Sequence, residues 1–544
     1  MNERYGRKKT FSGFLILLML LFSFGGCGRA DNMNEELNMM ISAPPVTIDP
    51  QRVSDVSSGN ISALVTTGLY MYDENNDLVP GLAESYEVSD DGLTVTYHLR
   101  KGLKWSDGSP LSAEDFVYGI QRLADPDTKS NAVYMITDCC VVKNAPEVSV
   151  GQLPVSELGV SAPDHYTFVL ELEVPCSYLN SLLAKPNFAP CSRSFQANCG
   201  SDYATSPGMM LSSGPFVIDR YEPLATQIHL IPNPYYFREG YPKLKGINLQ
   251  VVSDLQQSAM CYDTGLLDIT SIGGAITDYY LGDPNIKSFD MSSIFFIYLN
   301  QGECKGLKNK NIRKALAKCI DRESICKNVL KLGSSPLTRM SPPGYYEEED
   351  GTDFSGDPDL YRKEMGYEPE QAKEYWRTGM ADLGISELEI GLSYPPAMSN
   401  IAEVIKNQTE KNLKGLTITL KPVTDKEYVD KAAKGEGYEM LIGGWVADYA
   451  DPSAFLSLMT VSQSGLIYNN QEYEDKIKES AGIVGQKKVR DQQLHNIEQM
   501  LIEDAACIPL YSKQSVYLIR KGIEGFLTAS DGTVVLAGAT KEVE

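Results

Sequence analysis

Residues 79–118 read VPGLAESYEVSDDGLTVTYHLRKGLKWSDGSPLSAEDFVY and contain two clear local patterns. Residues 85–88 and 94–99 flank the turn sequence Ser-Asp-Asp-Gly and alternate in polarity, which predicts an antiparallel β-hairpin. Ser112 and Asp115 precede an apolar run with the spacing of a capping box, which predicts the start of a helix. The local signals agree with one another, and they indicate a chain that mixes strands and helices.

Helices and strands also alternate in the last third of the chain. Apolar spacing predicts helices over residues 371–383 and 401–412, with strands over 387–393, 416–420 and 440–442. Such alternation is typical of an α/β lobe. Further elements are expected elsewhere: an extended segment at 38–49, a helix at 59–69, a hairpin at 214–218 and 226–231, a strand at 295–299, and helices at 312–320 and after Asp321.

The composition indicates a folded protein with more than one lobe. A chain of 544 residues exceeds what one hydrophobic core usually organises. Its hydrophobic content of 42%, with 31 Tyr and 29 Pro, is typical of a turn-rich globular protein rather than a disordered one. The net charge of −23, without a cluster of Lys and Arg, argues against a nucleic-acid partner.

The N-terminus has the organisation of a secretion signal. Basic residues precede an apolar run of 11 residues from Phe14 to Phe24, and Gly-Gly-Cys27 follows. Because a helix needs about 20 residues to cross a bilayer, residues 1–26 are predicted to be a signal peptide and not a permanent anchor. The small residues before Cys27 resemble the lipobox of bacterial lipoproteins, although Phe24 stands where Leu is usual. We expect a lipid on Cys27 and a tether over residues 27–36; ordinary secretion is the alternative.

The sequence lacks the motifs of common catalytic and metal sites, and the residues that such sites use occur singly. It contains no Gly-rich phosphate or dinucleotide motif, no H-E-x-x-H and no paired C-x-x-C. The four His residues are widely spaced, which provides poorly for a metal site or a His-based triad. Ser324 and Lys327 match S-x-x-K, but the companion motifs of penicillin-binding enzymes are missing. We therefore predict no enzymatic activity, no metal and no cofactor.

Ten of the 11 cysteines follow Cys27. Outside the cytoplasm some of them could pair, and Cys191 with Cys199 would close the shortest plausible loop, although spacing alone does not determine the pairing. Cys319 and Cys326 fall on apolar helical faces, which is typical of small buried hydrophobic residues.

Several blocks of residues occur in a recognisable order along the chain. The longest begins at Gly68-Leu69-Tyr70, continues through residues 79–94 and 98–108, and ends at 113–118. Shorter blocks are Ser213–Phe216, Asn233–Tyr236, Tyr298–Asn300, Ile312–Leu316, Ile320–Arg322, Gly444–Pro452 and Ile508–Tyr511. These blocks resemble the oligopeptide-binding family of ABC-importer receptors, solute-binding protein family 5. They span nearly all of the chain after the signal peptide.

The resemblance implies a two-lobed α/β fold of the periplasmic-binding-protein type, a class II, cluster C flytrap with an extra subdomain in the first lobe. The ligand would lie in the cleft between the lobes, and two chain crossings near residues 288–292 and 508–514 would act as hinges. The expected boundaries are 37–66, 204–290 and 512–544 for lobe I, 67–203 for its extra subdomain, and 291–511 for lobe II.

The resemblance also implies a binding role for Asp448. In the peptide-binding members the corresponding acidic residue pairs with the α-ammonium of the ligand. An ammonium that enters a dry cleft needs such a carboxylate, because its burial otherwise costs several kcal/mol. The alternative for Asp448 is a structural turn cap before Asp451 and Pro452. Trp445 is expected to form the wall of a side-chain pocket, with packing in the core as the alternative.

Five further positions complete the expected site. The absence of side chains at Gly443 and Gly444 leaves the backbone free for close approach of a ligand strand. From the other lobe, Ser54 and the backbone of Val56 match the region that pairs with the peptide. Tyr449, next to Asp448, is also expected to contact the ligand. The peptide would then be held as an added strand, with main-chain hydrogen bonds providing the affinity.

The function implied by the resemblance is capture of oligopeptides on the extracytoplasmic face of the cell membrane. The lipid anchor would hold the protein at the membrane, and its partners would be the permease and cytoplasmic ATPase subunits of an ABC importer. We expect a monomer. The alternatives are a different cargo on the same fold, such as a nickel chelate, haem or an oligosaccharide, a peptide-sensing receptor that serves no transporter, or a secreted hydrolase.

Overall fold

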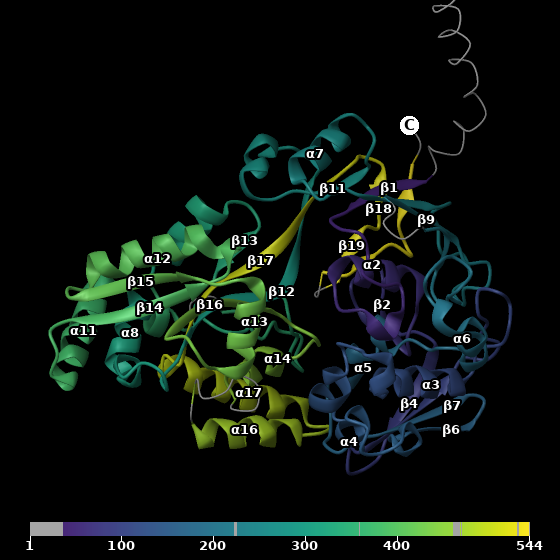
Figure 1. Cartoon of the computed structure of the whole chain (residues 1–544), viewed down its shortest axis with the longest axis horizontal. Coiled ribbons are helices and arrows are strands. Elements are labelled where there is room, and N and C mark those ends of the chain that lie inside the picture. Colours follow the sequence, from purple (N-terminus) through teal and green to yellow (C-terminus); the bar gives the residue numbers. More distant parts are fainter. Residues whose placement is uncertain are drawn as a thin grey trace, which may run out of the picture.

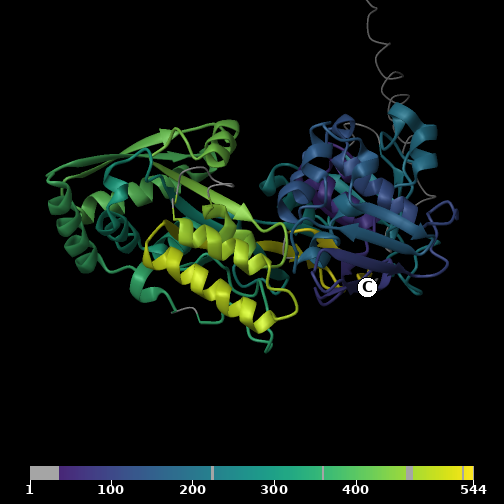
Figure 2. The ribbon, with the colours of Figure 1, turned by 90° about the horizontal axis from the view of Figure 1, so that it is seen from below.

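The structure is a computed structural model of the chain and describes residues 36–221, 226–357, 360–460, 468, 470–529 and 532–542. It consists of two lobes that lie side by side (Figures 1 and 2). The expected signal peptide 1–26 and the expected lipidation site Cys27 lie outside the described residues. Among the described residues, no helix is both long enough and apolar enough to cross a membrane.

One eleven-stranded sheet runs through both lobes. In lobe I it contains β11 (Ile269–Ser271), β1 (Leu37–Ile41), β10 (Ile247–Val251), β9 (Gln227–Pro232) and β8 (Phe216–Arg220). In lobe II it contains β16 (Met440–Val446), β14 (Leu388–Tyr394) and β15 (Leu416–Pro422). Two long antiparallel strands, β12 (Ile286–Leu299) and β17 (Cys507–Ile519), connect the two halves, and β13 (Ser334–Pro336) pairs with β17.

The strands β12 and β17 pass together from one lobe to the other. Their register is regular from Ile286 to Asp290, and between Asp290 and Ile294 three residues of β12 lie opposite one residue of β17. A second, smaller shift lies between Phe295 and Phe296, where β17 has one extra residue, Leu510. Such a bulge bends a strand and increases its twist. The two expected crossings, near residues 288–292 and 508–514, fall on this pair of strands.

A second, four-stranded sheet belongs to the segment 67–203 of lobe I. It contains β4 (Ala83–Val88), β5 (Thr94–Leu99), β7 (Thr167–Glu171) and β6 (Val160–Asp164), and it packs with α3 (Ala113–Ala124) around a core cluster formed almost entirely by this segment. The predicted hairpin and capping box are both confirmed: Gly92 of the turn has a φ of +72°, and Asp115 Oδ2 accepts a hydrogen bond from the Ser112 N–H at 2.8 Å.

Lobe II has helices on both faces of its part of the sheet, and the predicted α/β lobe is confirmed. Its strand β14 is parallel to both β15 and β16. One core cluster holds α8 (Lys310–Lys318), α11 (Pro369–Leu383) and α12 (Ser399–Asn412). The other holds α14 (Ser453–Leu456), α16 (Gln471–Ala481), α17 (Lys487–Glu503) and part of α13 (Asp425–Lys434).

One prediction about local structure needs correction, and one possibility that the sequence left open is not observed. The first helix, α2, spans Val56–Val65 rather than residues 59–69, because Asp55 caps it and its Oδ1 accepts a hydrogen bond from the Ser58 N–H at 2.9 Å. The cysteines of the described residues are all free, and no disulfide joins Cys191 to Cys199. The buried Cys191 sulfur instead lies 3.5 Å from the Tyr203 hydroxyl.

Candidate ligand-binding cleft between the lobes

Two glycines near the end of β16 pack against aromatic rings of β12. A Cβ on Gly443 would lie 2.7 Å from Cε2 of Tyr298, and a Cβ on Gly444 would lie 2.5 Å from Cε1 of Phe295. These separations are shorter than carbon atoms tolerate, so only glycine fits at either position. The absence of side chains at these glycines thus lets the two strands and their rings pack, and the expected approach of a ligand strand to this backbone stays a prediction.

The outer edge of β16 is nevertheless open to a ligand at Gly444. Strand β12 pairs with the inner edge along residues 440–446, whereas β14 pairs with the outer edge only at Met440 and Leu441. At Gly444 the N–H donates to the hydroxyl of Tyr428 on α13 at 3.1 Å, and that hydroxyl donates to the Gly444 carbonyl at 3.2 Å. One tyrosine hydroxyl thus occupies a main-chain edge that, among the described residues, no strand covers.

The loop that follows β16, residues 447–452, is fixed from behind by lobe II. The Asp451 carboxylate pairs with both Nη atoms of Arg490 on α17, and both side chains are almost fully buried. The Tyr345 hydroxyl bonds to the Tyr449 and Asp451 carbonyls, the latter at 2.8 Å. Asp451 also closes a local turn, because its Oδ1 accepts a hydrogen bond from the Ser453 N–H at 2.9 Å.

Three consecutive residues of this loop contact the segment 67–203 of lobe I. Asp448 Oδ1 accepts a hydrogen bond from the Tyr134 hydroxyl at 3.0 Å. The ring of Tyr449 stacks on that of Tyr178, with centroids 3.8 Å apart and planes inclined by 9°. The Ala450 N–H donates to Ser181 Oγ at 3.2 Å. The loop therefore links the two lobes at the position where the sequence placed the ligand's ammonium partner.

The electrostatic setting of Asp448 follows from these contacts. Burial raises the pKa of the Tyr134 phenol, and the Asp448 carboxylate raises it further, so the phenol remains a hydrogen-bond donor at neutral pH. Asp448 itself is half-buried. A carboxylate in this position can accept a further donor from a ligand that enters between the lobes.

The other predicted site residues are distributed over both lobes. Trp445 is half-buried and packs against the lobe II core that contains Phe296, and its expected role as the wall of a side-chain pocket stays a prediction. Ser54 is exposed, and its Oγ accepts a weak hydrogen bond from the Asn131 amide at 3.4 Å. Val56, with 71% of its surface exposed, is the first residue of α2 and not part of an extended strand. The structure thus groups Gly444, Trp445, Asp448 and Tyr449 together and places Ser54 and Val56 on lobe I.

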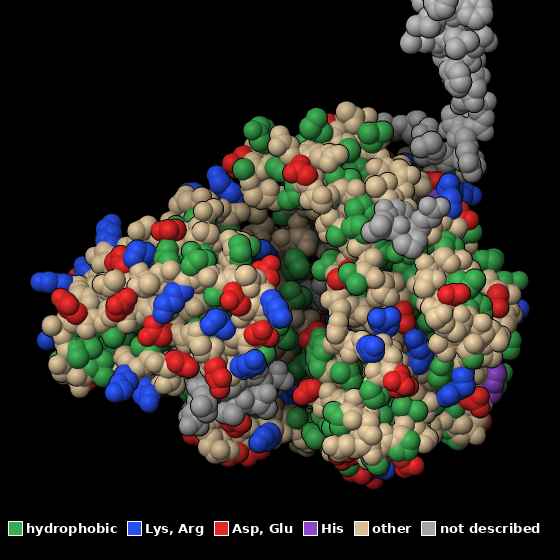
Figure 3. All heavy atoms as spheres, viewed as in Figure 1, with side chains coloured by type: hydrophobic (Ala, Val, Ile, Leu, Met, Phe, Trp, Pro, Cys, Tyr) green, Lys and Arg blue, Asp and Glu red, His purple; other side chains and the backbone are tan. Residues whose placement is uncertain are grey.

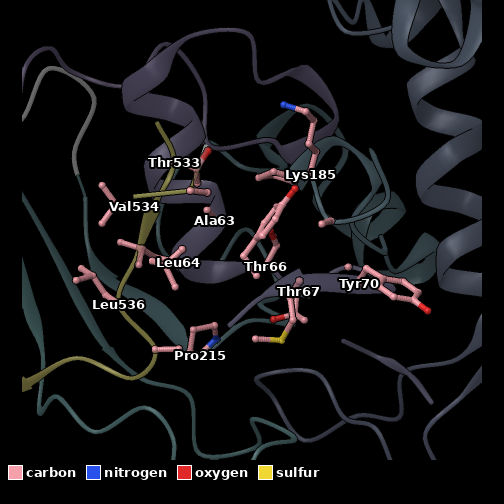
Figure 4. A pocket seen from close by; sticks show the side chains of 18 of the residues that line it. Ala63, Leu64, Thr66, Thr67, Tyr70, Lys185, Pro215, Thr533, Val534 and Leu536 are labelled. Atoms are coloured by element: carbon pink, nitrogen blue, oxygen red, sulfur yellow. The ribbon is translucent and has the colours of Figure 1, made fainter. Parts of the chain in front are cut away.

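The space between the lobes is visible as a deep groove in Figure 3. Beside the 447–452 loop, a cavity of about 520 Å³ is lined from both lobes by residues that include Tyr97, Tyr178, Tyr346, Asp451 and Arg490. A smaller pocket of about 80 Å³ lies within lobe I (Figure 4), among residues that include Ala63, Leu64, Thr66, Lys185 and Val534. None of the predicted site residues lines that pocket.

A family model supplies the deciding comparison. Residues 77–465 match the model described as "Bacterial extracellular solute-binding proteins, family 5 Middle". The chain belongs to this family. Among its relatives is the dipeptide-binding protein of Lactococcus lactis, which is 29% identical over 84% of each chain.

Solved structures show how far the similarity of this family 5 protein extends in space. Listeria monocytogenes OppA bound to peptide is 29% identical, covers 93% of this chain and 99% of its own, and gives a TM-score of 0.73. The unliganded open form of the murein tripeptide-binding protein MppA is 24% identical, covers 93% and 97% of the two chains, and gives a TM-score of 0.80. The two-lobed α/β fold is thus shared by peptide-bound and open members.

Four residues of the cleft in this family 5 protein were missed by sequence reasoning. They are Tyr134, Tyr178, Ser181 and Tyr428. The first three lie in the Cys-, Pro- and Ser-rich part of the chain, where neither helical nor strand periodicity identifies a face. Tyr428 lies in the first turn of α13, whose Thr424–Glu427 capping box could have indicated the helix but not the contact with β16.

Proposed function

We propose that this family 5 solute-binding protein captures short peptides between its lobes and delivers them to the permease of an ABC importer, whose ATPase subunits are cytoplasmic. One observation carries the proposal: Asp448 lies beside the open edge of β16 on a loop that contacts lobe I. This arrangement offers a carboxylate for an α-ammonium and a main-chain edge for the next residues of a peptide. The names of the Lactococcus and Listeria relatives support the same ligand class.

The binding step follows from the geometry of the cleft. The ammonium of the peptide pairs with Asp448, so the charge is neutralised as water leaves the cleft. The peptide backbone takes over the N–H and C=O of Gly444 from the Tyr428 hydroxyl, and Trp445 and Tyr449 lie beside the bound chain. From lobe I, Ser54 and the backbone around Val56 complete the contacts. Main-chain recognition of this kind tolerates many side chains.

Closure of the lobes then makes the complex recognisable to the importer. We divide the chain into lobe I (37–66, 204–290 and 512–544), its subdomain (67–203) and lobe II (291–511). On this division the partners Tyr134, Tyr178 and Ser181 of the 448–450 loop belong to the subdomain. A ligand that touches both lobes stabilises the closed form by its greater affinity for it. The cargo is released unchanged, so the protein binds without catalysing a reaction.

The N-terminal segment gives the proposed location. After removal of residues 1–26, a lipid on Cys27 and a tether over 27–36 hold the monomer on the extracytoplasmic face of the cell membrane. The family's extracellular description is consistent with this location. Intact-mass measurement of the membrane-extracted protein tests it: wild type should carry a lipid mass that a Cys27→Ser variant lacks, and equal masses would refute the anchor.

Calorimetry with paired peptides tests the ligand class. We expect Asp448→Asn to weaken binding of a free-amine tripeptide by about tenfold to a hundredfold, because a charge-assisted hydrogen bond is worth about 1.5–3 kcal/mol. Binding of the N-acetylated tripeptide should change little. Asp475→Asn on the outer helix α16 is the control. Equal losses for the two peptides would contradict the role of Asp448, and absence of binding by wild type would refute peptide capture.

A further inference from the structure

Lys513 lies on β17 at the place where this strand passes between the lobes. Alternate side chains of a strand share a face, so Tyr511, Lys513 and Tyr517 point to the same side of β17. Tyr511 belongs to the lobe II core, whereas Tyr517 packs against Phe526 in the lobe I core, with ring centroids 5.0 Å apart. Lys513 lies between these two cores and is only half-buried.

The Lys513 ammonium has no anionic partner among the described residues. Its Nζ lies 4.7 Å from the centroid of the Phe295 ring, and the backbone N–H of Lys513 donates to Ser293 Oγ at 3.3 Å. Burial lowers the pKa of the ammonium, with no acidic side chain to offset the effect. A half-buried cation without a counterion is costly, and a bound anion would remove that cost.

The same cation is connected to the proposed peptide site through one aromatic ring. The Phe295 ring stacks on Tyr511, with centroids 4.7 Å apart and planes inclined by 8°. The Phe295 ring also packs against Gly444 of β16, where an added Cβ would lie 2.5 Å from the ring. Lys513, Phe295 and Gly444 therefore lie on three neighbouring strands of the sheet, β17, β12 and β16.

We propose that Lys513 binds a carboxylate of the peptide cargo, so that the cleft reads both charges of a short zwitterionic peptide. This inference rests on the proposed function, because it takes Asp448 as the partner of the ammonium. Because Asp448 and Lys513 are both fixed in the cleft, a peptide that lacks either its terminal ammonium or its carboxylate would bind more weakly.

The positions of the two charged residues limit the length of such a peptide. Val446 pairs with Ser293, and Ser293 accepts the hydrogen bond from Lys513, so these three residues form one row across the sheet. Asp448 lies two residues beyond Val446 along the chain. Asp448 and Lys513 are therefore offset by two strand spacings across the sheet and by two residues along the strand direction. This offset separates their Cα atoms by on the order of 12 Å. At about 3.4 Å per residue, an extended peptide of about three to five residues spans this separation once the lysine side chain is included.

Calorimetry with the mature protein tests the inference. The probes are trialanine, tetra-alanine and octa-alanine, each as the free acid and as the C-terminal amide. Wild type should bind the short free acids at least about tenfold more tightly than their amides. Lys513→Met should remove this preference by weakening the acids and leaving the amides within about threefold, and Lys513→Arg should retain it.

A matched control and a second peptide pair complete the design. Lys314→Met removes another lysine that lies over a ring, that of Tyr375 at 5.6 Å, and whose pKa burial also lowers, but on the outer helices of lobe II; it should change no affinity. Comparison of Ala-Glu-Ala amide with Ala-Gln-Ala amide shows whether a side-chain carboxylate can replace the terminal one.

The outcomes separate this inference from the function on which it rests. If wild type binds acids and amides equally while Asp448→Asn still discriminates against free amines, the role of Lys513 is wrong and peptide capture stands. Equal losses for acid and amide in Lys513→Met would also refute it. If wild type binds none of the peptides, both proposals fail.

Discussion

The hydroxyl of Tyr428 makes the two hydrogen bonds to Gly444 that the backbone of a neighbouring strand would otherwise make. This hydroxyl satisfies a main-chain N–H and C=O that would otherwise be left without partners in a largely apolar setting. A peptide that adds to β16 must displace the hydroxyl before it can form the same bonds. Tyr428 therefore competes with the ligand for the edge.

Removal of this hydroxyl should strengthen peptide binding. We expect Tyr428→Phe to lower the dissociation constant of a short peptide by about fivefold, because the ligand no longer replaces an existing hydrogen bond worth about 1 kcal/mol. Isothermal titration calorimetry measures the change.

The matched control for this variant is Tyr438→Phe. The Tyr438 ring lies in the same core cluster, and its hydroxyl is buried without a hydrogen-bond partner among the described residues. The control should leave the affinity unchanged. A weaker affinity for Tyr428→Phe would show that the hydroxyl assists the ligand rather than competes with it.

Single residues differ in how far the sequence could predict them. Asp448 was predictable because it lies in a family block, and the structure does place it at the contact between the lobes. Its role as a ligand for an ammonium stays a prediction. Tyr134 was not predictable, because its contact joins residues 314 positions apart in the chain and no local pattern reports such a pairing.

At the level of elements, the loop 447–452 connects the end of β16 to both lobes. The Asp451–Arg490 pair and Tyr345 fix its lobe II side. Its lobe I side is held by two contacts: the Tyr449 ring stacks on Tyr178, and the Ala450 N–H donates a hydrogen bond to Ser181. The orientation of one lobe against the other thus depends on a short, well-anchored loop.

Loss of the stacked pair should make closure less favourable. Tyr178→Leu removes an aromatic contact between the lobes that is worth about 0.5–1.5 kcal/mol beyond its buried area, so peptide affinity should fall by about threefold to tenfold. Tyr166→Leu is the control, since Tyr166 packs edge-on against His165 within the same segment of lobe I at 5.0 Å. Equal effects of the two variants on affinity would argue for general destabilisation instead.

The regular elements were predicted better than the connection between them. The 85–99 hairpin and the helix after Ser112 were predictable because turn and cap residues act locally. Strand β12 was predicted only from Phe295 onwards, because its first half is polar. That half becomes a strand by pairing with β17, a contact across more than 200 residues that overrides local preference.

For the whole molecule, the shared sheet restricts how the lobes can move. The lobes are joined by two hydrogen-bonded strands rather than by a flexible linker, and the larger of the two irregularities in their pairing lies beside Met291 and Lys513. Relative motion is therefore concentrated at this bulge, as bending or twisting of the strand pair. Ligand binding shifts the balance between open and closed forms only through contacts that differ between them.

Peptide binding should compact and stabilise the whole protein. At a peptide concentration of about 100 times the dissociation constant, the free energy of unfolding should rise by about 2.7 kcal/mol, which raises the melting temperature. Small-angle X-ray scattering should show a smaller radius of gyration at the same concentration. Asp448→Asn is then at only about 1 to 10 times its own dissociation constant, so its free energy of unfolding should rise by about 0.4–1.4 kcal/mol, with a smaller decrease in the radius of gyration. Tight binding with no change in the radius of gyration would exclude closure around the ligand.

The order in which β12 and β17 enter the sheet also has a consequence for biosynthesis. Strand β11 pairs with β1 on one side and with β17 on the other, so the lobe I sheet stays unfinished until residues 517–519 have been made. Lobe II, in contrast, is contiguous between the two crossing strands. During secretion the later-made half can therefore complete its core first, and the earlier-made half waits with an exposed strand edge for the last part of the chain to arrive.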